Sequence, residues 1–497
     1  MHNLDFRCKR AAIVESLPRR HDVSNFKPGR SRPAGRMTIL DSFSQPEGVF
    51  PARERSGPGP SEPPVAVPVG VILAAGSSSR LGGVPKPLVR VAGVTLLERA
   101  DSTLRSAGVE RIVVVVGHAR ADVREFVASE GLDVELVEND HFALGNGSSL
   151  LVGGRAAAAR FLVAMVDHVV APEAVTRLLA SRAAFALAVD SKPCHCDIEE
   201  ATKVRLEGDR VVAATRELEE YDAVDAGFAV CDLAVVAVAE RSLLAGETTW
   251  NAVKRQWLAE GGEIAAVDLE GLFWIDVDTP EDVRRAERLI VASAARKPSD
   301  GPVARLLNRR LSWRLSCLLL RAGVSPDAAT LLAFVLALLA AGALAAGHEW
   351  SAVLVGGGVL TQIASIVDGV DGEIARASLR ASPAGAFLDS VLDRIADAAL
   401  LAGLALAAGL DTPTWAALAA ALFGSLQVPY VRASYEASFG RPFPSPTHRL
   451  GVGRDVRLLV VAVSAVALQP FGGLVAVALL ANLEVAHRVA RAWHARP

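Results

Sequence analysis

The sequence predicts two domains of different fold class: an α/β Rossmann-like domain, then an all-α polytopic membrane domain with about six transmembrane helices. Before about residue 296, short apolar strands alternate with helical stretches. After about residue 325 the apolar residues concentrate, and the mean hydropathy of the whole chain reaches +0.32. We therefore expect a disordered tail over 1–66, an α/β domain over 67–296, an interfacial helix and linker over 297–327, and a membrane domain over 328–497.

The predicted tail is rich in Pro, Arg, Ser and Gly and lacks the apolar core of a signal peptide. Met37 is a second possible start of translation. The net charge of −3 gives no global reason to bind nucleic acid. Five scattered cysteines do not suggest a disulfide framework.

The α/β domain opens on a strand that leads into a loop suited to phosphate. An apolar run from residue 69 ends in Ala74, Ala75 and Gly76, and serines and glycines follow. Such a loop lets backbone N–H groups approach a triphosphate closely. Arg80 and Lys86 add positive charge, and Lys86 stands between two prolines. The combination is a stronger signal than a glycine-rich loop alone.

Carboxylates occur where later strands of this domain end. Strands are expected over 111–117 and 161–168, with a helix near 95–107, so ligands should bind at the carboxyl edge of the sheet. Asp167 falls at that edge, although a turn or helix N-cap would also explain it. Asp276 and Asp278 would share one face of a strand, and with Asp167 they could hold Mg²⁺ or Mn²⁺. Alternatively, Asp278 belongs to a helix-start signal with Pro280 in the first turn, and both interpretations can hold.

Residues 70–290 resemble the sugar-nucleotide and alcohol-phosphate nucleotidyltransferases, in particular the inositol-1-phosphate cytidylyltransferases. The resemblance rests on the loop just described and on segments at 145–150, 167–168, 200–204 and 225–227. It implies that Arg80 and Lys86 act in catalysis on CTP and that Lys203 holds the alcohol phosphate. It also places four residues near the nucleotide: Gly145, Asn146, Gly147 and Ser148. Val166 and Ala226 depart from the family pattern, which bears on the substrate more than on the reaction.

The second half contains six apolar segments, near 328–347, 351–367, 384–409, 413–436, 454–469 and 471–490. Several approach the roughly 20 residues that a bilayer requires. The basic stretch 305–315 suits a helix lying on the membrane surface, or a soluble linker helix. With six spans, one side collects most of the loop arginines, so the positive-inside rule predicts a cell-membrane protein whose α/β domain and active sites face the cytoplasm. Those arginines are Arg376, Arg380, Arg432, Arg441, Arg449, Arg454, Arg457, Arg488 and Arg491.

The strongest motif of the chain reads D-x2-D-G-x2-A-R-x8-G-x3-D-x3-D. Its aspartates are Asp368, Asp371, Asp389 and Asp393. Spacings of three and four put each pair on one helix face. Four carboxylates at a membrane boundary repel one another unless cations neutralise them, so we predict a divalent metal site rather than ordinary solvated acids.

The motif is the signature of the CDP-alcohol phosphatidyltransferase family, which residues 303–495 resemble. The resemblance implies two divalent ions on the four aspartates, bridged by the pyrophosphate of a CDP substrate, with Asp393 as the base for the acceptor hydroxyl. It also implies that Gly372, Ala375, Arg376 and Gly385 lie beside the nucleotide. Arg432 and Arg454 could clasp an acceptor phosphate or serve only as topogenic charge. Homodimers are usual in that family.

The fusion of the two halves resembles the bifunctional inositol-1-phosphate cytidylyltransferases and di-myo-inositol-phosphate-phosphate synthases. That resemblance implies CTP and inositol 1-phosphate as substrates, and a phosphorylated di-inositol solute as product. One alternative is a lipid synthase that uses CDP-diacylglycerol, fused to a nucleotidyltransferase for another alcohol phosphate. A membrane half that serves only as an anchor is less compatible with the intact aspartates, and no inverted repeat supports a transporter.

Overall fold

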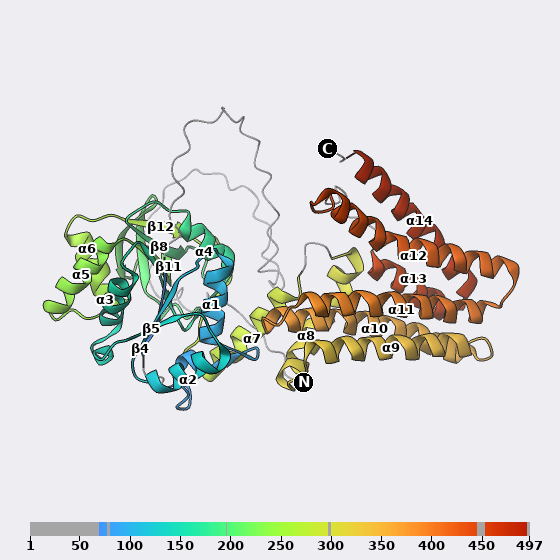
Figure 1. The fold of residues 1–497 in the computed structure, drawn as a ribbon, viewed down its shortest axis with the longest axis horizontal. Helices are drawn as coiled ribbons and strands as arrows, with labels where there is room; N and C mark the ends of the chain where they lie inside the picture. The colour runs from blue at the N-terminus through green and yellow to red at the C-terminus, as the bar shows by residue number, and fades with distance from the viewer. Residues whose placement is uncertain (1–68, 77–79, 195, 297–299, 445–452, 495–497) are drawn as a thin grey trace, which may run out of the picture. The chain divides into compact units, whose positions relative to one another are not determined.

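The computed structural model describes residues 69–76, 80–194, 196–296, 300–444 and 453–494. Within these residues it contains an α/β domain and a helical domain (Figure 1). The predicted tail over 1–66 lies outside the described residues.

The α/β domain is built on a nine-stranded mixed sheet. Along the sheet the strands are β5 (Glu135–Glu138), β4 (Ile112–Val116), β1 (Val69–Ala74), β6 (Phe161–Met165), β11 (Ala223–Cys231), β8 (Phe185–Asp190), β12 (Ile264–Asp268), β10 (Arg210–Thr215) and β9 (Lys203–Glu207). The four strands from β5 to β6 are parallel, whereas β11 runs antiparallel to both of its neighbours in that order. The strands predicted at 69–76, 111–117 and 161–168 are present as β1, β4 and β6, which end at Ala74, Val116 and Met165, and these carboxyl ends lie at one edge.

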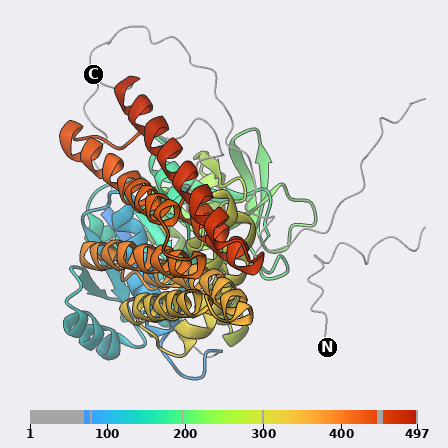
Figure 2. The same ribbon diagram turned by 90° about the vertical axis from the view of Figure 1, so that its right-hand side faces the viewer.

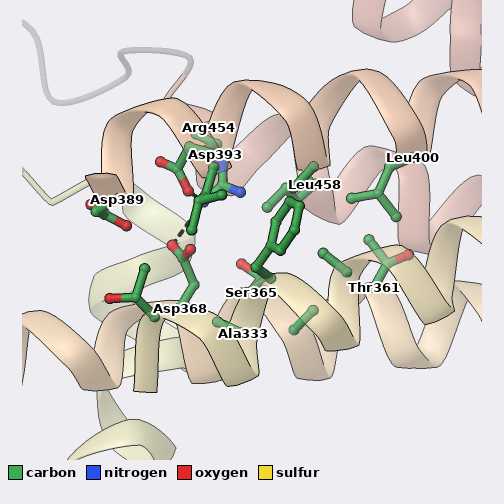
Figure 3. Close-up of a pocket in the computed structure, with 15 residues that line it drawn as sticks. Ala333, Thr361, Ser365, Asp368, Asp389, Asp393, Leu400, Arg454 and Leu458 are labelled. Carbon is green, nitrogen blue, oxygen red and sulfur yellow. Dashed lines mark hydrogen bonds and ion pairs between the residues drawn. The ribbon is translucent and has the colours of Figure 1, made fainter. Parts of the chain in front are cut away.

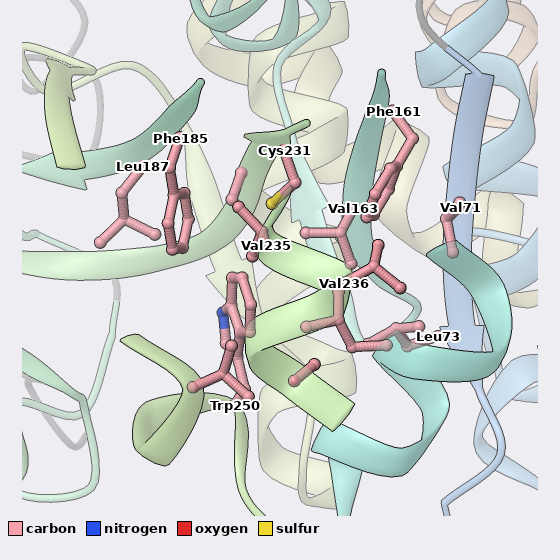
Figure 4. Packing of buried hydrophobic residues seen from close by; sticks show 14 of the residues in the cluster. Val71, Leu73, Phe161, Val163, Phe185, Leu187, Cys231, Val235, Val236 and Trp250 are labelled. Carbon is pink, nitrogen blue, oxygen red and sulfur yellow. The ribbon is translucent and has the colours of Figure 1, made fainter. Parts of the chain in front are cut away.

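Within the described residues, six α-helices lie between strands of this domain: α1 (Leu96–Ser106), α2 (Arg120–Glu130), α3 (Asn146–Ala157), α4 (Pro172–Leu179), α5 (Leu233–Leu244) and α6 (Trp250–Ala259). Helix α7 (Pro280–Ala294) follows the last strand. Short ribbons pair β2 (Arg90–Val91) with β3 (Val94–Thr95), and β7 (His168–Val170) with β13 (Trp274–Asp276). The core packs branched apolar side chains of the sheet, such as Val71 and Val163, against Val236 of α5 and Trp250 of α6 (Figure 4).

The helical domain begins with a π-helical turn, η4 (Ala304–Asn308), and α8 (Arg309–Arg321). It continues with α9 (Pro326–Ala346), α10 (Ser351–Ala377), α11 (Pro383–Ala408), α12 (Thr412–Phe439), α13 (Arg454–Val466) and α14 (Pro470–His494). Each of these last six helices overlaps one predicted span. Figures 1 and 2 show α9, α10 and α11 side by side, and α12 packs along α14.

Small residues allow the helices of this domain to approach closely. A Cβ atom added at Gly403 of α11 would lie 2.4 Å from the backbone oxygen of Ala341 in α9. Close packing of this kind is what holds helices together where lipid removes the hydrophobic driving force. Ser325 and Ser382, each followed by proline, accept hydrogen bonds that cap the starts of α9 and α11.

Among the described residues, four helices are long and apolar enough to cross a membrane: α9, α10, α12 and α14. The count of six spans is therefore not confirmed. Helix α11 carries Asp389, Asp393 and Arg394 in its first half and Asp397 near its middle. Helix α13 has only 13 residues, about 20 Å at the α-helical rise, which is shorter than the hydrocarbon core.

Candidate active sites

The first candidate site lies at the turn between β6 and β7, next to the end of β13. Asp167 occupies the turn between β6 and β7, and the β7–β13 register places His168 opposite Asp276. Asp167 Oδ1 lies 2.8 Å from His168 Nδ1, and Asp276 Oδ1 lies 3.9 Å from the same nitrogen. Ligand atoms of these three residues all fall within 4.8 Å of one another.

Lys86 joins this cluster from the loop after β1. Its Nζ lies 2.5 Å from Asp167 Oδ2 and also donates to Asp278 Oδ1. Lys86 therefore links Asp278 to Asp167 of the cluster. The helix-start signal is present as well, because Thr279 and Asp282 form a reciprocal cap and Pro280 begins α7.

The pKa values of these groups follow from burial and from the neighbouring charges. Burial raises the pKa of Asp276 to about 6, and the carboxylates of Asp167 and Asp278 add to that rise. Burial would lower the pKa of His168, but the carboxylates of Asp276 and Asp167 outweigh it and raise the pKa to about 9. Burial would also lower the pKa of Lys86, yet Asp167 and Asp278 hold it above its usual range.

The arrangement fits a divalent cation. Asp276 Oδ1 is buried and has no hydrogen-bond partner, so one carboxylate oxygen of the cluster is left unsatisfied. Carboxylate oxygens are the ligands that Mg²⁺ and Mn²⁺ prefer. Sequence reasoning did not place His168 in the cluster, although a histidine directly after a strand-end aspartate was a visible signal.

Four further residues were predicted for the first site: Ala74, Ala75, Gly76 and Arg80. Arg80 is exposed, with its Nη1 3.2 Å from Glu200 and 3.9 Å from Asp278. Ala74 and Ala75 are buried at the end of β1, Gly76 follows them, and residues 77–79 lie outside the described residues.

Two more predicted segments, the start of α3 and the start of β9, contact other parts of the α/β domain. At the start of α3, which Gly145 precedes, Gly147 donates its backbone N–H to Thr248 O at 2.9 Å, and Asn146 accepts from the backbone of Trp250 at 2.8 Å. Ser148 Oγ accepts from Asn139 Nδ2 at 2.9 Å. Lys203 opens β9, with its ammonium 5.7 Å from the centre of the Tyr221 ring.

The second candidate site is an acidic cluster between α10 and α11. Ligand oxygens of Asp368, Asp389 and Asp393 lie within 4.8 Å of one another. They gather at one end of a pocket whose other end is lined by Thr361 and Leu400 (Figure 3). Both pairs of motif aspartates lie on continuous helices, as their spacing predicts. A set of three close carboxylates fits a divalent cation.

Asp371 is turned toward α9 within the same motif. It is 8% exposed, and its Oδ2 accepts a hydrogen bond from Thr330 Oγ1 at 2.6 Å. Thr330 lines the pocket together with Asp368, so Asp371 borders the site.

Arg454, the first residue of α13, enters the acidic cluster. Its Nη1 lies 2.7 Å from Asp368 Oδ2 and 2.8 Å from Asp393 Oδ1, and its Nε lies 2.7 Å from Asp397 Oδ1. Sequence reasoning missed Asp397, although it continues the four-residue spacing of Asp389 and Asp393.

The remaining predicted residues of the second site are more dispersed. Gly372, Ala375 and Arg376 lie in the last turns of α10. Gly385 lies in the first turn of α11, where its backbone N–H donates to Ser382 Oγ at 3.0 Å. Arg432 lies toward the end of α12, exposed, with its Nε 3.0 Å from Glu436 of the same helix.

Comparison with known proteins agrees with the division of the chain into an α/β domain and a helical domain. Residues 70–198 match the family model of the MobA-like NTP transferase domain, and residues 324–490 match that of CDP-alcohol phosphatidyltransferase. A Rubrobacter xylanophilus protein named "Bifunctional IPC transferase and DIPP synthase" is 48% identical over 421 residues, which cover 84% of this chain and 95% of that protein. The chain belongs to the bifunctional IPC transferase and DIPP synthase family. It is therefore a transferase.

Other relatives extend the comparison. A bifunctional IPC transferase and DIPP synthase of Thermococcus kodakarensis is 38% identical and covers 75% of this chain and 83% of that protein. The solved structure of the inositol-1-phosphate CTP transferase from T. maritima is 26% identical, covers 44% of this chain and 92% of that chain, and gives a TM-score of 0.42.

Gly227 offers a test of how the first site of this bifunctional family member is built. Its φ is +78°, and an added Cβ would lie 2.4 Å from the His168 ring. We expect Gly227→Ala to displace His168 and to lower nucleotidyl transfer by roughly tenfold or more, since small misplacements in active sites are costly. Gly208→Ala is the matched control, because Gly208 has φ +64° but open space around it. The control should cost only the strain of about 1 kcal/mol. Equal rates of nucleotidyl transfer in the two variants would contradict the placement of His168 in the first site.

Proposed function

We propose that this chain performs two successive transfers on inositol 1-phosphate. In the first, CTP and inositol 1-phosphate give CDP-inositol and pyrophosphate. In the second, CDP-inositol and another inositol 1-phosphate give a di-myo-inositol phosphate carrying a further phosphate, together with CMP. The observation that carries the proposal is the presence of both acidic clusters in a chain whose bifunctional relatives match over most of their length.

In the first transfer, the phosphate oxygen of inositol 1-phosphate forms a bond to the α-phosphorus of CTP, and the bond to the β-phosphate breaks. Two anions must meet, so positive charge in a fixed geometry is the main requirement. Lys86 is held between Asp167 and Asp278, and Arg80 stands at the edge of the site, where both can contact the phosphates. We assign Lys203 to the phosphate of the alcohol.

Asp167, Asp276 and Asp278 would hold Mg²⁺ or Mn²⁺ in the first site. The ion, when bound, offsets the negative charge of the triphosphate. The buried, unsatisfied Asp276 Oδ1 supports this assignment. We place residues near the start of α3, Gly145 to Ser148, beside the nucleotide, where hydrogen bonds to Thr248, Trp250 and Asn139 keep the helix terminus in a fixed position.

In the second transfer, a hydroxyl of the acceptor forms a bond to the β-phosphorus of CDP-inositol, and the bond to the α-phosphate breaks, so that CMP leaves. Asp393 accepts the hydroxyl proton. Asp368, Asp371, Asp389 and Asp393 would hold the divalent ions. Gly372, Ala375, Arg376 and Gly385 line the nucleotide side, and Arg432 and Arg454 serve the acceptor phosphate.

We further propose that all six helices from α9 to α14 belong to the membrane domain, with both sites on the cytoplasmic side and the enzyme a homodimer. The arginines near the ends of α10, α12 and α14 support this sidedness through the positive-inside rule. We also propose that domain boundaries lie at about residues 67, 297 and 328.

The products of one incubation test the proposed function. Purified protein in detergent receives CTP, Mg²⁺ and ¹³C-labelled inositol 1-phosphate, with no added lipid, and the products are identified by ³¹P and ¹³C NMR. We expect pyrophosphate, CMP and a water-soluble diester that joins two inositols. A strict requirement for CDP-diacylglycerol would contradict the proposal and would favour a lipid synthase.

A further inference from the structure

Arg454 fills a position among the same carboxylates that would hold the ions. Its Nη1 contacts Asp368 Oδ2 at 2.7 Å and Asp393 Oδ1 at 2.8 Å, and its side chain is 18% exposed. Asp368 and Asp393 belong to the trio of close carboxylates (Figure 3). A carboxylate oxygen that accepts a short hydrogen bond from a guanidinium has to give it up in order to ligate a metal ion.

A separate contact holds the other side of the same guanidinium. Arg454 Nε donates to Asp397 Oδ1 at 2.7 Å, one helical turn beyond Asp393. Asp397 is 6% exposed as a residue. The guanidinium is a rigid plane, so its Nη atoms can leave the cluster only if the whole group pivots about this contact with Asp397.

Buried polar atoms around Asp397 are unsatisfied. Asp397 Oδ2 and Arg457 Nη1 are both buried without a hydrogen-bond partner, and Arg457 Nη2 lies 3.7 Å from Asp397 Oδ2. A buried acceptor and a buried donor that are both unsatisfied are costly, which indicates a site that is completed by a ligand or by movement of a neighbour.

We propose that Arg454 is the internal counter-ion of the aspartate cluster in the ion-free protein, and that divalent ions displace it. Asp397 is then a positioning residue: it keeps Nε in place while the Nη end leaves Asp368 and Asp393. The released guanidinium, beside Arg457, becomes available to an anionic phosphate ester. The inference rests on the proposed second transfer only for the identity of that ester, inositol 1-phosphate.

The displacement makes ion binding and phosphate binding cooperative. An ion frees the guanidinium for phosphate, so phosphate must by linkage favour ion binding to the same degree. Removal of Arg454 should therefore tighten ion binding, whereas removal of an ordinary structural residue would weaken it.

Titration with Mn²⁺ tests the displacement without any turnover. The full chain in detergent carries Asp276→Asn to weaken ion binding at the first site, and free Mn²⁺ is followed by electron paramagnetic resonance. We expect Arg454→Met to bind Mn²⁺ about fivefold more tightly or more, as typical couplings between sites require. Arg380→Met is the matched control, because Arg380 is exposed in the loop after α10. Equal or weaker Mn²⁺ binding by Arg454→Met would overturn the proposal.

A second measurement uses the protein with its natural residue at 454, in case Arg454→Met does not fold. Phenylglyoxal modifies accessible guanidinium groups, and mass spectrometry reads the modification of Arg454 with Arg380 as an internal reference. Mn²⁺ alone should increase modification of Arg454 about fivefold, in line with the same coupling, and added inositol 1-phosphate should reduce it again. No change or a decrease with Mn²⁺ alone would overturn the displacement. An increase that inositol 1-phosphate does not reverse would support the displacement and count against the proposed acceptor.

Discussion

Asp393→Asn is expected to stop the second transfer and leave the first intact. The carboxamide cannot accept the proton of the acceptor hydroxyl, and it is also a weaker ligand for a divalent cation. General-base catalysis alone is worth about 10² to 10⁴ in rate, so the loss should be about a thousandfold. With CTP, Mg²⁺ and inositol 1-phosphate, ³¹P NMR should show CDP-inositol and pyrophosphate accumulating without the diester.

Asp411→Asn is the matched control for this prediction. Asp411 caps α12 by accepting from the backbone of Thr414 at 3.0 Å, and asparagine caps helices equally well. The control should make the diester at the rate of the unaltered protein. If the Asp393→Asn protein also makes the diester at that rate, Asp393 is not the base.

Lys86→Met is expected to slow the first transfer strongly and leave the second intact. The substitution removes a cation that contacts Asp167 and Asp278, and with it the positive charge nearest to the proposed phosphate position. Loss of one such electrostatic contact typically costs about 10² to 10³ in rate. Pyrophosphate release from CTP should fall by that factor, whereas added CDP-inositol and inositol 1-phosphate should still be converted to diester and CMP.

Lys192→Met controls for the loss of a positive charge elsewhere in the same domain, because the Lys192 residue is exposed. It should release pyrophosphate normally. Loss of both transfers in Lys86→Met would instead indicate misfolding, which a thermal melt would detect. If Lys86→Met retains both transfers at full rate, Lys86 has no role in catalysis.

Apart from the grouping of Asp167 with Asp276, the sequence predicted those parts of the two sites that lie close together along the chain. Asp368 with Asp371, and Asp389 with Asp393, share helix faces because spacings of three and four do so in any helix. The strand that ends at Ala74 could be expected from a short β-branched run followed by glycine. Local periodicity is sufficient for such features.

Contacts between distant segments were not predictable in the same way. His168 lies opposite Asp276 only because β7 pairs with β13, and no local pattern encodes that register. Asp397 matters because Arg454 approaches it from another helix. Asp371 faces Thr330 of α9 rather than the other three aspartates, which depends on how α9 packs on α10.

Hydropathy alone does not show whether an apolar segment forms a helix long enough to span a membrane. Segment 454–469 is apolar enough to predict a span, but α13 stops at Val466, and Leu468 adopts a φ of +58° before α14 begins at Pro470. Chain length within the helix, rather than composition, separates α13 from the four candidate membrane helices.

We propose that one chain holds two separate active sites that share CDP-inositol as an intermediate. The most direct test mixes the Asp393→Asn and Lys86→Met proteins with CTP, Mg²⁺ and inositol 1-phosphate, and follows the diester by ³¹P NMR. The account predicts diester and CMP from the mixture and from neither variant alone. A mixture that forms no diester, although each variant retains its own half-reaction, would contradict it.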